Sequence, residues 1–85
     1  MKPQRLPTSA RAVLAMNVKI IRSEAALSQE KLAELAGFHR TYVSQVERCV
    51  TNPTVDNVER LAKVLDVPIA RLFQSTIAGE RLVSP

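Results

Sequence analysis

A group of hydrogen-bonding side chains lies within one short segment of the chain, FHRTYVSQVER at residues 38–48. Wound as a helix at about 100° per residue, the segment places the group along one arc, called the outer arc below: Arg40, Thr41, Ser44, Gln45 and Arg48. Arginine matches O6 and N7 of guanine, glutamine matches N6 and N7 of adenine, and serine or threonine suits bases or phosphate. These residue types have the chemistry to read base edges in DNA, although an ordinary solvated helix face is the simpler alternative.

Two residues of this segment break local rules of helix chemistry. Arg40 falls in the first turn, where the helix dipole favours anions, so a bound phosphate or guanine would supply the missing negative charge. Glu47 borders the opposite, apolar side of the helix, where a partly buried carboxylate needs a partner. Three valines make up that side: Val43, Val46 and Val50. We expect Glu47 to pair with Arg22 in a structural contact, and reading of cytosine by Glu47 is the alternative.

The elements that would position these residues are helices, because apolar spacing is helical almost throughout and no segment predicts a strand. We expect an all-α, compact five-helix domain, with helices at about residues 9–25, 29–36, 38–48, 55–65 and 68–74. Ser9, Ser28 and Thr54 are the expected caps. Gly37 would end the second helix in a left-handed conformation, and the short link to the third helix is a helix-turn-helix arrangement. The side chains predicted to point inward from the first, second and fourth helices are Leu14, Val18, Ile21, Ala25, Leu32, Leu35, Ala36, Val55, Val58, Leu61, Ala62 and Leu65.

Composition limits the possible functions. The chain has 85 residues, one cysteine, one histidine and a net charge of +4. Residues 1–52 hold eight Lys and Arg against four Asp and Glu, whereas residues 53–85 hold four of each. A local excess of this kind suggests a polyanion partner such as nucleic acid, and a solubilising surface is the alternative.

Other classes of protein lack the residues that they would need. The sequence offers no nucleophile–base pair, no phosphate-binding glycine loop and no spacing of metal ligands, so we expect no enzyme, no cofactor and no metal. The opening residues MKPQRLPTSA lack the apolar run of a signal peptide, and nothing approaches a membrane span. We expect a soluble, cytoplasmic protein with residues 1–8 as a flexible arm, 9–77 as the functional domain and 78–85 as a loose tail.

Residues 12–73 resemble the phage-repressor/Cro type, or xenobiotic-response-element-like type, of helix-turn-helix regulator. The resemblance is carried by a set of short words: Ile21-Arg22, Leu27-Ser28-Gln29, Leu32-Ala33, Gly37, Tyr42-x-Ser44, Glu47-Arg48, Asn52-Pro53-Thr54 and Leu61-Ala62. Within that family, HRTYVSQVER followed by NPT is most similar to the small controller proteins of restriction-modification systems.

The resemblance implies a homodimer that binds double-stranded DNA at a roughly palindromic operator. The positions matching the family's base-reading residues are Arg40, Thr41, Ser44 and Gln45, and those matching its backbone contacts are Gln29, Tyr42, Arg48, Thr51 and Asn52. The family also pairs an arginine of its first helix with the glutamate of its third, as Arg22 and Glu47 would. Dimerisation runs through the last helix in the family. Here that helix has an apolar stripe at helical spacing: Ile69, Leu72, Phe73 and, if the helix extends, Ile77.

Three residues depart from the family's pattern. Cys49 stands where glycine is usual, so a left-handed residue there would be strained by roughly 1 kcal/mol. Thr51 stands where arginine is frequent. His39 replaces the usual cap, and we expect its ring to cap the helix, with an approach to phosphate as the alternative. The alternative function from another class is an antitoxin-type module whose main partner is a toxin protein.

Overall fold

The computed structural model describes residues 9–75, and helices are its only regular elements over that range. They are four α-helices and a terminal 3-10 helix: α1 (Ala10–Glu24), α2 (Gln29–Ala36), α3 (Arg40–Glu47), α4 (Val55–Leu65) and η1 (Ile69–Phe73). The all-helical prediction with a helix-turn-helix is confirmed. The prediction of a fifth α-helix is wrong, because the last element is a 3-10 helix of five residues.

The buried side chain of Asn17 joins the last element to α1. Its Nδ2 donates to the carbonyl oxygens of Leu72 and Gln74, each at 2.9 Å. These two bonds tie the end of η1 and Gln74 to α1. Asn17 is only 2% exposed and is the one buried polar residue among those described. Ile77, expected to extend this stripe, lies outside the described residues.

Hydroxyl side chains begin three of the four α-helices. Ser9 Oγ accepts from the backbone N–H of Ala12 at 3.0 Å, and Ser28 Oγ accepts from that of Lys31 at 2.9 Å. Thr54 Oγ1 caps α4 in the same way, at 3.1 Å from the backbone nitrogen of Asn57. Such caps are each worth about 1 kcal/mol. His39 occupies the cap position of α3 without a side-chain hydrogen bond, so the expectation that its ring caps the helix is wrong.

Every α-helix is followed, one or two residues after its end, by a residue in the left-handed conformation. These residues are Ala26, Cys49 and Asp66, each at φ 60°, and Gly37 at φ 80°. After each of them the next backbone N–H reaches back across the helix end, as from Val50 to the carbonyl of Gln45 at 3.0 Å. This is the Schellman termination, for which glycine is the residue that costs least. Three of the four termini use a residue with a Cβ atom, and Cys49 is one of them.

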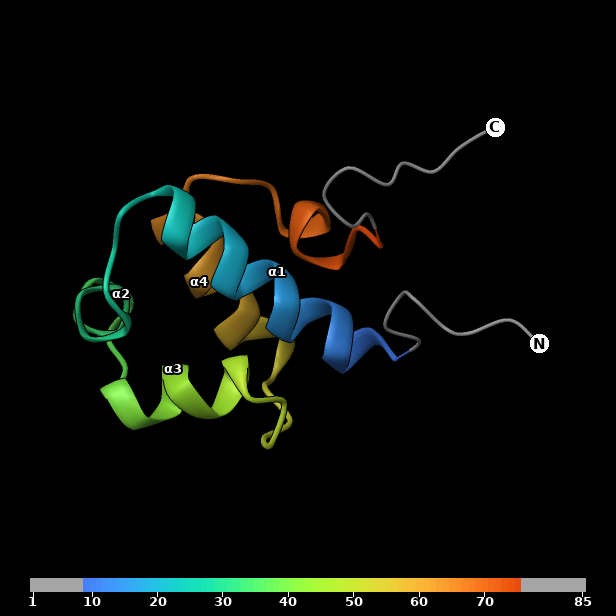
Figure 1. The fold of residues 1–85 in the computed structure, drawn as a ribbon, viewed down its shortest axis with the longest axis horizontal. Helices are drawn as coiled ribbons and strands as arrows, with labels where there is room; N and C mark the ends of the chain where they lie inside the picture. Colours follow the sequence, from blue (N-terminus) through green and yellow to red (C-terminus); the bar gives the residue numbers. More distant parts are fainter. Residues whose placement is uncertain (1–8, 76–85) are drawn as a thin grey trace.

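The core lies between α1 and the helices around it (Figure 1). In that view α1 and α4 overlap in the centre, α2 is seen end-on, α3 runs along the lower edge, and η1 packs beside α1. The buried side chains include Val18, Leu32, Val43, Leu61 and Leu72, each with no exposed surface. Within residues 9–75 no helix is long and apolar enough to cross a membrane.

Four residues that were predicted to face inward are exposed: Ala25, Leu35, Val50 and Val55. Leu35 is 53% exposed because α2 buries the arc that carries Leu32, Ala33 and Ala36, and Leu35 falls to one side of it. Val50 is 58% exposed since α3 already ends at Glu47. Val55 and Ala25 lie at the very ends of α4 and α1, where the chain has not yet entered or has already left the core.

Candidate nucleic-acid interface

The outer arc of α3 faces away from the core. Val43 and Val46 on the inner side are 0% and 2% exposed, whereas Arg40 and Thr41 are exposed and Ser44 and Gln45 are half-buried. The one carboxylate of the helix, Glu47, does not reach the outer arc, because its side chain is only 3% exposed. The arc therefore presents cations and neutral hydrogen-bonding groups to the surroundings, without an acid of its own helix among them.

Arg48 and Ser44 are joined along this arc. Arg48 Nε donates to Ser44 Oγ at 3.2 Å, so the hydroxyl acts as an acceptor there. A serine hydroxyl also has one hydrogen to donate, and that hydrogen is left for another acceptor. Arg48 follows the last helical residue as the cap of the C-terminus, which puts a positive charge where the helix dipole favours one.

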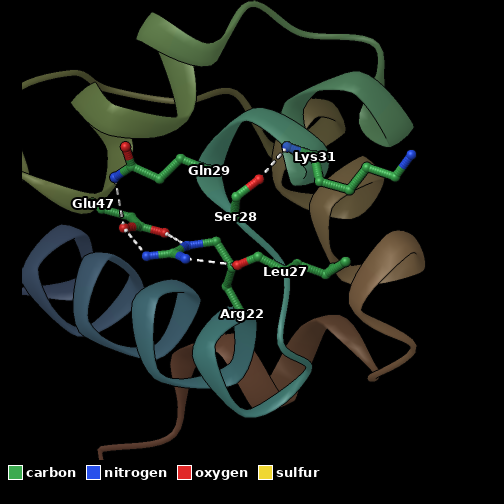
Figure 2. A network of polar contacts seen from close by, with 6 residues as sticks. All are labelled: Arg22, Leu27, Ser28, Gln29, Lys31 and Glu47. Atoms are coloured by element: carbon green, nitrogen blue, oxygen red, sulfur yellow. Dashed lines mark hydrogen bonds and ion pairs between the residues drawn. The ribbon is translucent and has the colours of Figure 1, made fainter.

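Arg22 of α1 and Glu47 of α3 form a bidentate ion pair in the interior (Figure 2). Arg22 Nε lies 2.5 Å from Oε2 of Glu47, and Nη2 lies 3.0 Å from Oε1. Arg22 Nη1 also donates to the carbonyl of Leu27 at 2.8 Å, which adds the α1–α2 link to the network. The hydrogen bond with Glu47 raises the pKa of Arg22 above its ordinary value and the attraction between the charges adds to this, although burial acts in the opposite direction.

Gln29 belongs to the same network, which the sequence did not predict. Its Nε2 donates to Oε1 of Glu47 at 3.0 Å, and Figure 2 shows its side chain turned toward that carboxylate. The expected role of Gln29 was a contact with phosphate, and its side-chain amide is instead engaged inside the protein. The two oxygens of Glu47 thus accept three bonds, and such satisfaction is what a buried carboxylate requires. The network holds α1, the start of α2 and the end of α3 in one arrangement.

A second group of contacts fixes the turn between α2 and α3 from the side of α4. Arg60 donates through Nε and Nη2 to the carbonyl of Ala36 at 3.1 and 2.9 Å, and through Nη2 to that of Gly37 at 3.1 Å. Its guanidinium carbon also lies 4.2 Å from the centre of the Phe38 ring, within range of a cation–π interaction. A Cβ atom on Gly37 would come within 2.7 Å of Arg60 Nη2. Glycine therefore suits this turn through its positive φ, and a larger residue would also make the Arg60 side chain move.

Tyr42 connects this second group to α3. Its ring centre lies 4.7 Å from that of Phe38, with the rings tilted by 45°. Its hydroxyl oxygen accepts a hydrogen bond from Nδ2 of Asn57 at 3.1 Å. Sequence reasoning missed Asn57 and Arg60, because both occupy solvent-facing positions of α4 by their spacing and reach the turn only through long side chains. The one available signal was that an arginine and an asparagine lie one helical turn apart, beside the apolar stripe.

Thr51 and Asn52 lie in the link between α3 and α4. Thr51 is half-buried and Asn52 is exposed. Asn52 also lines a largely apolar groove of about 390 Å³ between the start of α1, the start of α4 and η1, together with Arg11, Val55 and Phe73. Neither residue is held by a side-chain hydrogen bond to another described residue.

The stripe proposed for dimerisation is only partly accessible. Ile69 and Phe73 are 36% and 41% exposed, while Leu72 has no exposed surface and closes the core of the protomer. Leu72, predicted as part of the dimerisation stripe, is thus buried within its own chain. A contact with another molecule through η1 would therefore use Ile69 and Phe73, and Leu72 would support them from within the core.

In the part of the chain that the structure describes, no group of three or more His, Cys, Asp or Glu is placed to hold a metal ion.

Comparison with known proteins gives a family and related structures. The helix-turn-helix family matches residues 18–72 of the chain. The control protein C.SmaI of Serratia marcescens is 44% identical over 61 residues, which make up 72% of this chain and 73% of that protein. The structure of the restriction-modification controller protein C.AhdI from Aeromonas hydrophila has a TM-score of 0.72 and 36% identity, over 74% of this chain and 96% of the other. SinR, the master regulator for biofilm formation, was solved in complex with DNA and is similar with a TM-score of 0.68 and 35% identity, over 72% of this chain and 98% of the other.

Proposed function

We infer, because this chain belongs to the helix-turn-helix family, that it is a sequence-specific DNA-binding regulator of transcription. The observation that carries the proposal is the outer arc of α3, which presents exposed arginines without a carboxylate, because the side chain of Glu47 is buried away from it. The arc is held on a rigid support by the Arg22–Glu47 network and by the contacts of Arg60. In helix-turn-helix proteins the second helix of the motif, which is α3 in this chain, is the element that enters the major groove.

The residues divide into two proposed roles at the DNA. Arg40, Thr41, Ser44 and Gln45 would read base edges, because they lie on the first turns of α3 where side chains reach the floor of the groove. Tyr42, Arg48, Thr51 and Asn52 would contact the sugar–phosphate backbone on either side. At Gln29 the contact with the DNA backbone would come from the N-terminus of α2 rather than from the side-chain amide, because that amide already donates to Glu47.

We further propose that the protein acts as a homodimer on a roughly palindromic operator. Exposed Ile69 and Phe73 on η1 support this, because an apolar pair at the surface marks an association site. A two-fold axis through this contact would set two α3 helices about 34 Å apart, one turn of DNA. The domain responsible would comprise residues 9–77, of which residues 76 and 77 lie outside the described structure, as do the proposed arm 1–8 and tail 78–85.

The similarity to C.SmaI and C.AhdI supports a finer proposal, a controller of a restriction-modification system in the cytoplasm. The relatives reported above are regulators by name, and none of them favours the antitoxin alternative.

Selection from random DNA followed by sequencing tests the function directly. We expect a motif with two inverted half-sites, and binding to it should weaken steeply with salt. A dimer that neutralises about 6–10 phosphates loses roughly 10³–10⁵ in affinity between about 50 and 200 mM salt. No enriched motif together with a flat salt titration would reject DNA as the partner. An enriched motif without inverted symmetry would reject the palindromic dimer alone.

A further inference from the structure

The Tyr42 hydroxyl and the Asn57 amide form a contact between α3 and α4. The pair lies at the border of the outer arc, and the hydrogen bond of 3.1 Å is only partly buried. Tyr42 is the single tyrosine of the chain. A phenolic hydroxyl can accept hydrogen bonds and has one hydrogen to donate. The direction of the bond therefore decides whether that hydrogen remains for a ligand.

The position of Arg60 fixes the direction of this bond. Arg60 Nη1 lies 3.5 Å from Oδ1 of Asn57. Arginine has only donors, so the amide atom nearest to it must be the oxygen, and the nitrogen then points at Tyr42. The hydroxyl of Tyr42 accepts this bond, and among the described residues no acceptor holds its own hydrogen.

We propose that Asn57 is a positioning residue for DNA binding, which keeps the Tyr42 hydroxyl as a donor directed at a phosphate oxygen. The inference rests on the proposed DNA-binding function and adds a residue of α4 that itself faces no base. The side-chain amide of Asn57 holds the hydroxyl oxygen of Tyr42 in place from the protein side. The free hydroxyl hydrogen of Tyr42 then points outward, toward the backbone of the DNA. Arg60 serves the same end by keeping the amide in the required orientation.

The substitution Asn57→Asp separates this role from simple support of the fold. A carboxylate has no hydrogen to donate near neutral pH, so the Tyr42 hydroxyl must turn round and donate to it. The fold should tolerate the change, since residue 57 lies in the first turn of α4, where the helix dipole favours negative charge. Arg60 nearby adds a favourable charge. We therefore expect unchanged or higher thermal stability together with weaker DNA binding.

The matched control for the added charge is Thr54→Asp. It places a carboxylate on the same turn of α4, keeps a capping side chain and does not contact Tyr42. Affinity for the selected operator is measured for both variants, for Tyr42→Phe and for the two double variants that combine each of them with Tyr42→Phe. We expect Tyr42→Phe to weaken binding about tenfold per half-site, as loss of a hydrogen bond to a charged group does. Its salt dependence should be unchanged, because the hydroxyl carries no charge.

We expect Asn57→Asp to weaken binding about tenfold more per half-site than Thr54→Asp does in the unaltered chain. In the Tyr42→Phe background the two aspartates should have equal effects. Equal effects in both backgrounds would overturn the proposal, because the loss would then be charge repulsion alone. If the unaltered chain selects no motif, the proposed function fails instead, and that outcome is recognised before any variant is made.

The Raman doublet of tyrosine gives a second measurement that needs no DNA, since it reports whether a phenolic oxygen mainly accepts or donates. With one tyrosine in the chain the signal has a single source. We expect the spectrum of the free protein to change from acceptor-like to donor-like in Asn57→Asp and to stay the same in Thr54→Asp. An unchanged spectrum in Asn57→Asp would also overturn the proposal.

Discussion

Replacing Cys49 by glycine should stabilise the protein. Cys49 ends α3 at φ 60°, where an L-residue with a Cβ atom costs roughly 1–2 kcal/mol. Glycine removes that cost, but it also loses about 0.5–1 kcal/mol more backbone entropy on folding. The cap itself is unaffected, because the bonds from Cys49 N to Val46 O at 3.1 Å and from Val50 N to Gln45 O at 3.0 Å are made by the backbone. The net gain should be about 0.5–1 kcal/mol, a rise in Tm of roughly 2–8 °C for a domain of this size.

The matched control is Cys49→Ala, which removes the thiol and keeps the Cβ atom. Urea unfolding of the three proteins, followed by circular dichroism, gives the free energy of unfolding and its dependence on denaturant. The glycine variant should be more stable than the alanine variant by the full gain, with an unchanged m-value. The opposite substitution, Gly37→Ala, should destabilise the fold, because Arg60 would also have to move away from the new Cβ atom. A glycine variant no more stable than the alanine variant would refute the assignment of strain to this position.

Other substitutions test the site and the interface. Arg40→Ala should cost about 1–3 kcal/mol on the selected operator and relax the preference at one base pair, whereas equal loss on random DNA would identify a phosphate contact. Glu47→Ala should destabilise folding by about 3 kcal/mol, as removal of one partner of a buried ion pair does, and Ser44→Ala should change stability by less than about 0.5 kcal/mol. A double-mutant cycle of Glu47→Ala with Arg22→Ala should show coupling well above a few tenths of a kcal/mol, and additive effects would contradict the pairing. Phe73→Glu should give a helical monomer with weakened operator binding, measured by mass in solution and circular dichroism; an unchanged dimer mass would exclude η1 as the contact.

The sequence predicted those parts of the fold that depend on neighbouring residues. Ser9, Ser28 and Thr54 cap their helices, and Gly37 ends α2, because each of these signals acts within one helical turn. The α3 residues of the outer arc are likewise turned outward, since the burial of Val43 and Val46 fixes the rotation of the helix.

The parts that the sequence did not predict depend on contacts between distant residues. Asn17 is polar within an apolar stripe, and only the nearness of η1, 55 residues further along, explains its burial. Arg60 and Asn57 have the spacing of solvent-facing residues, and their long side chains reach the turn between α2 and α3. Leu35 and Val55 follow helical periodicity, yet they are exposed because α2 is rotated toward Ala33 and because α4 enters the core only after its first turn.

The bond of Asn17 to the last helix also sets an order of events during synthesis. A ribosome releases α1 early, with Asn17 in it, and the acceptors at Leu72 and Gln74 emerge only after all four α-helices. Until then the amide of Asn17 lacks these two acceptors. The face that carries Ile69 and Phe73 is therefore assembled last, when the helix-turn-helix has already left the ribosome. In the proposed homodimer, two chains could therefore join through this face only once each had a complete helix-turn-helix.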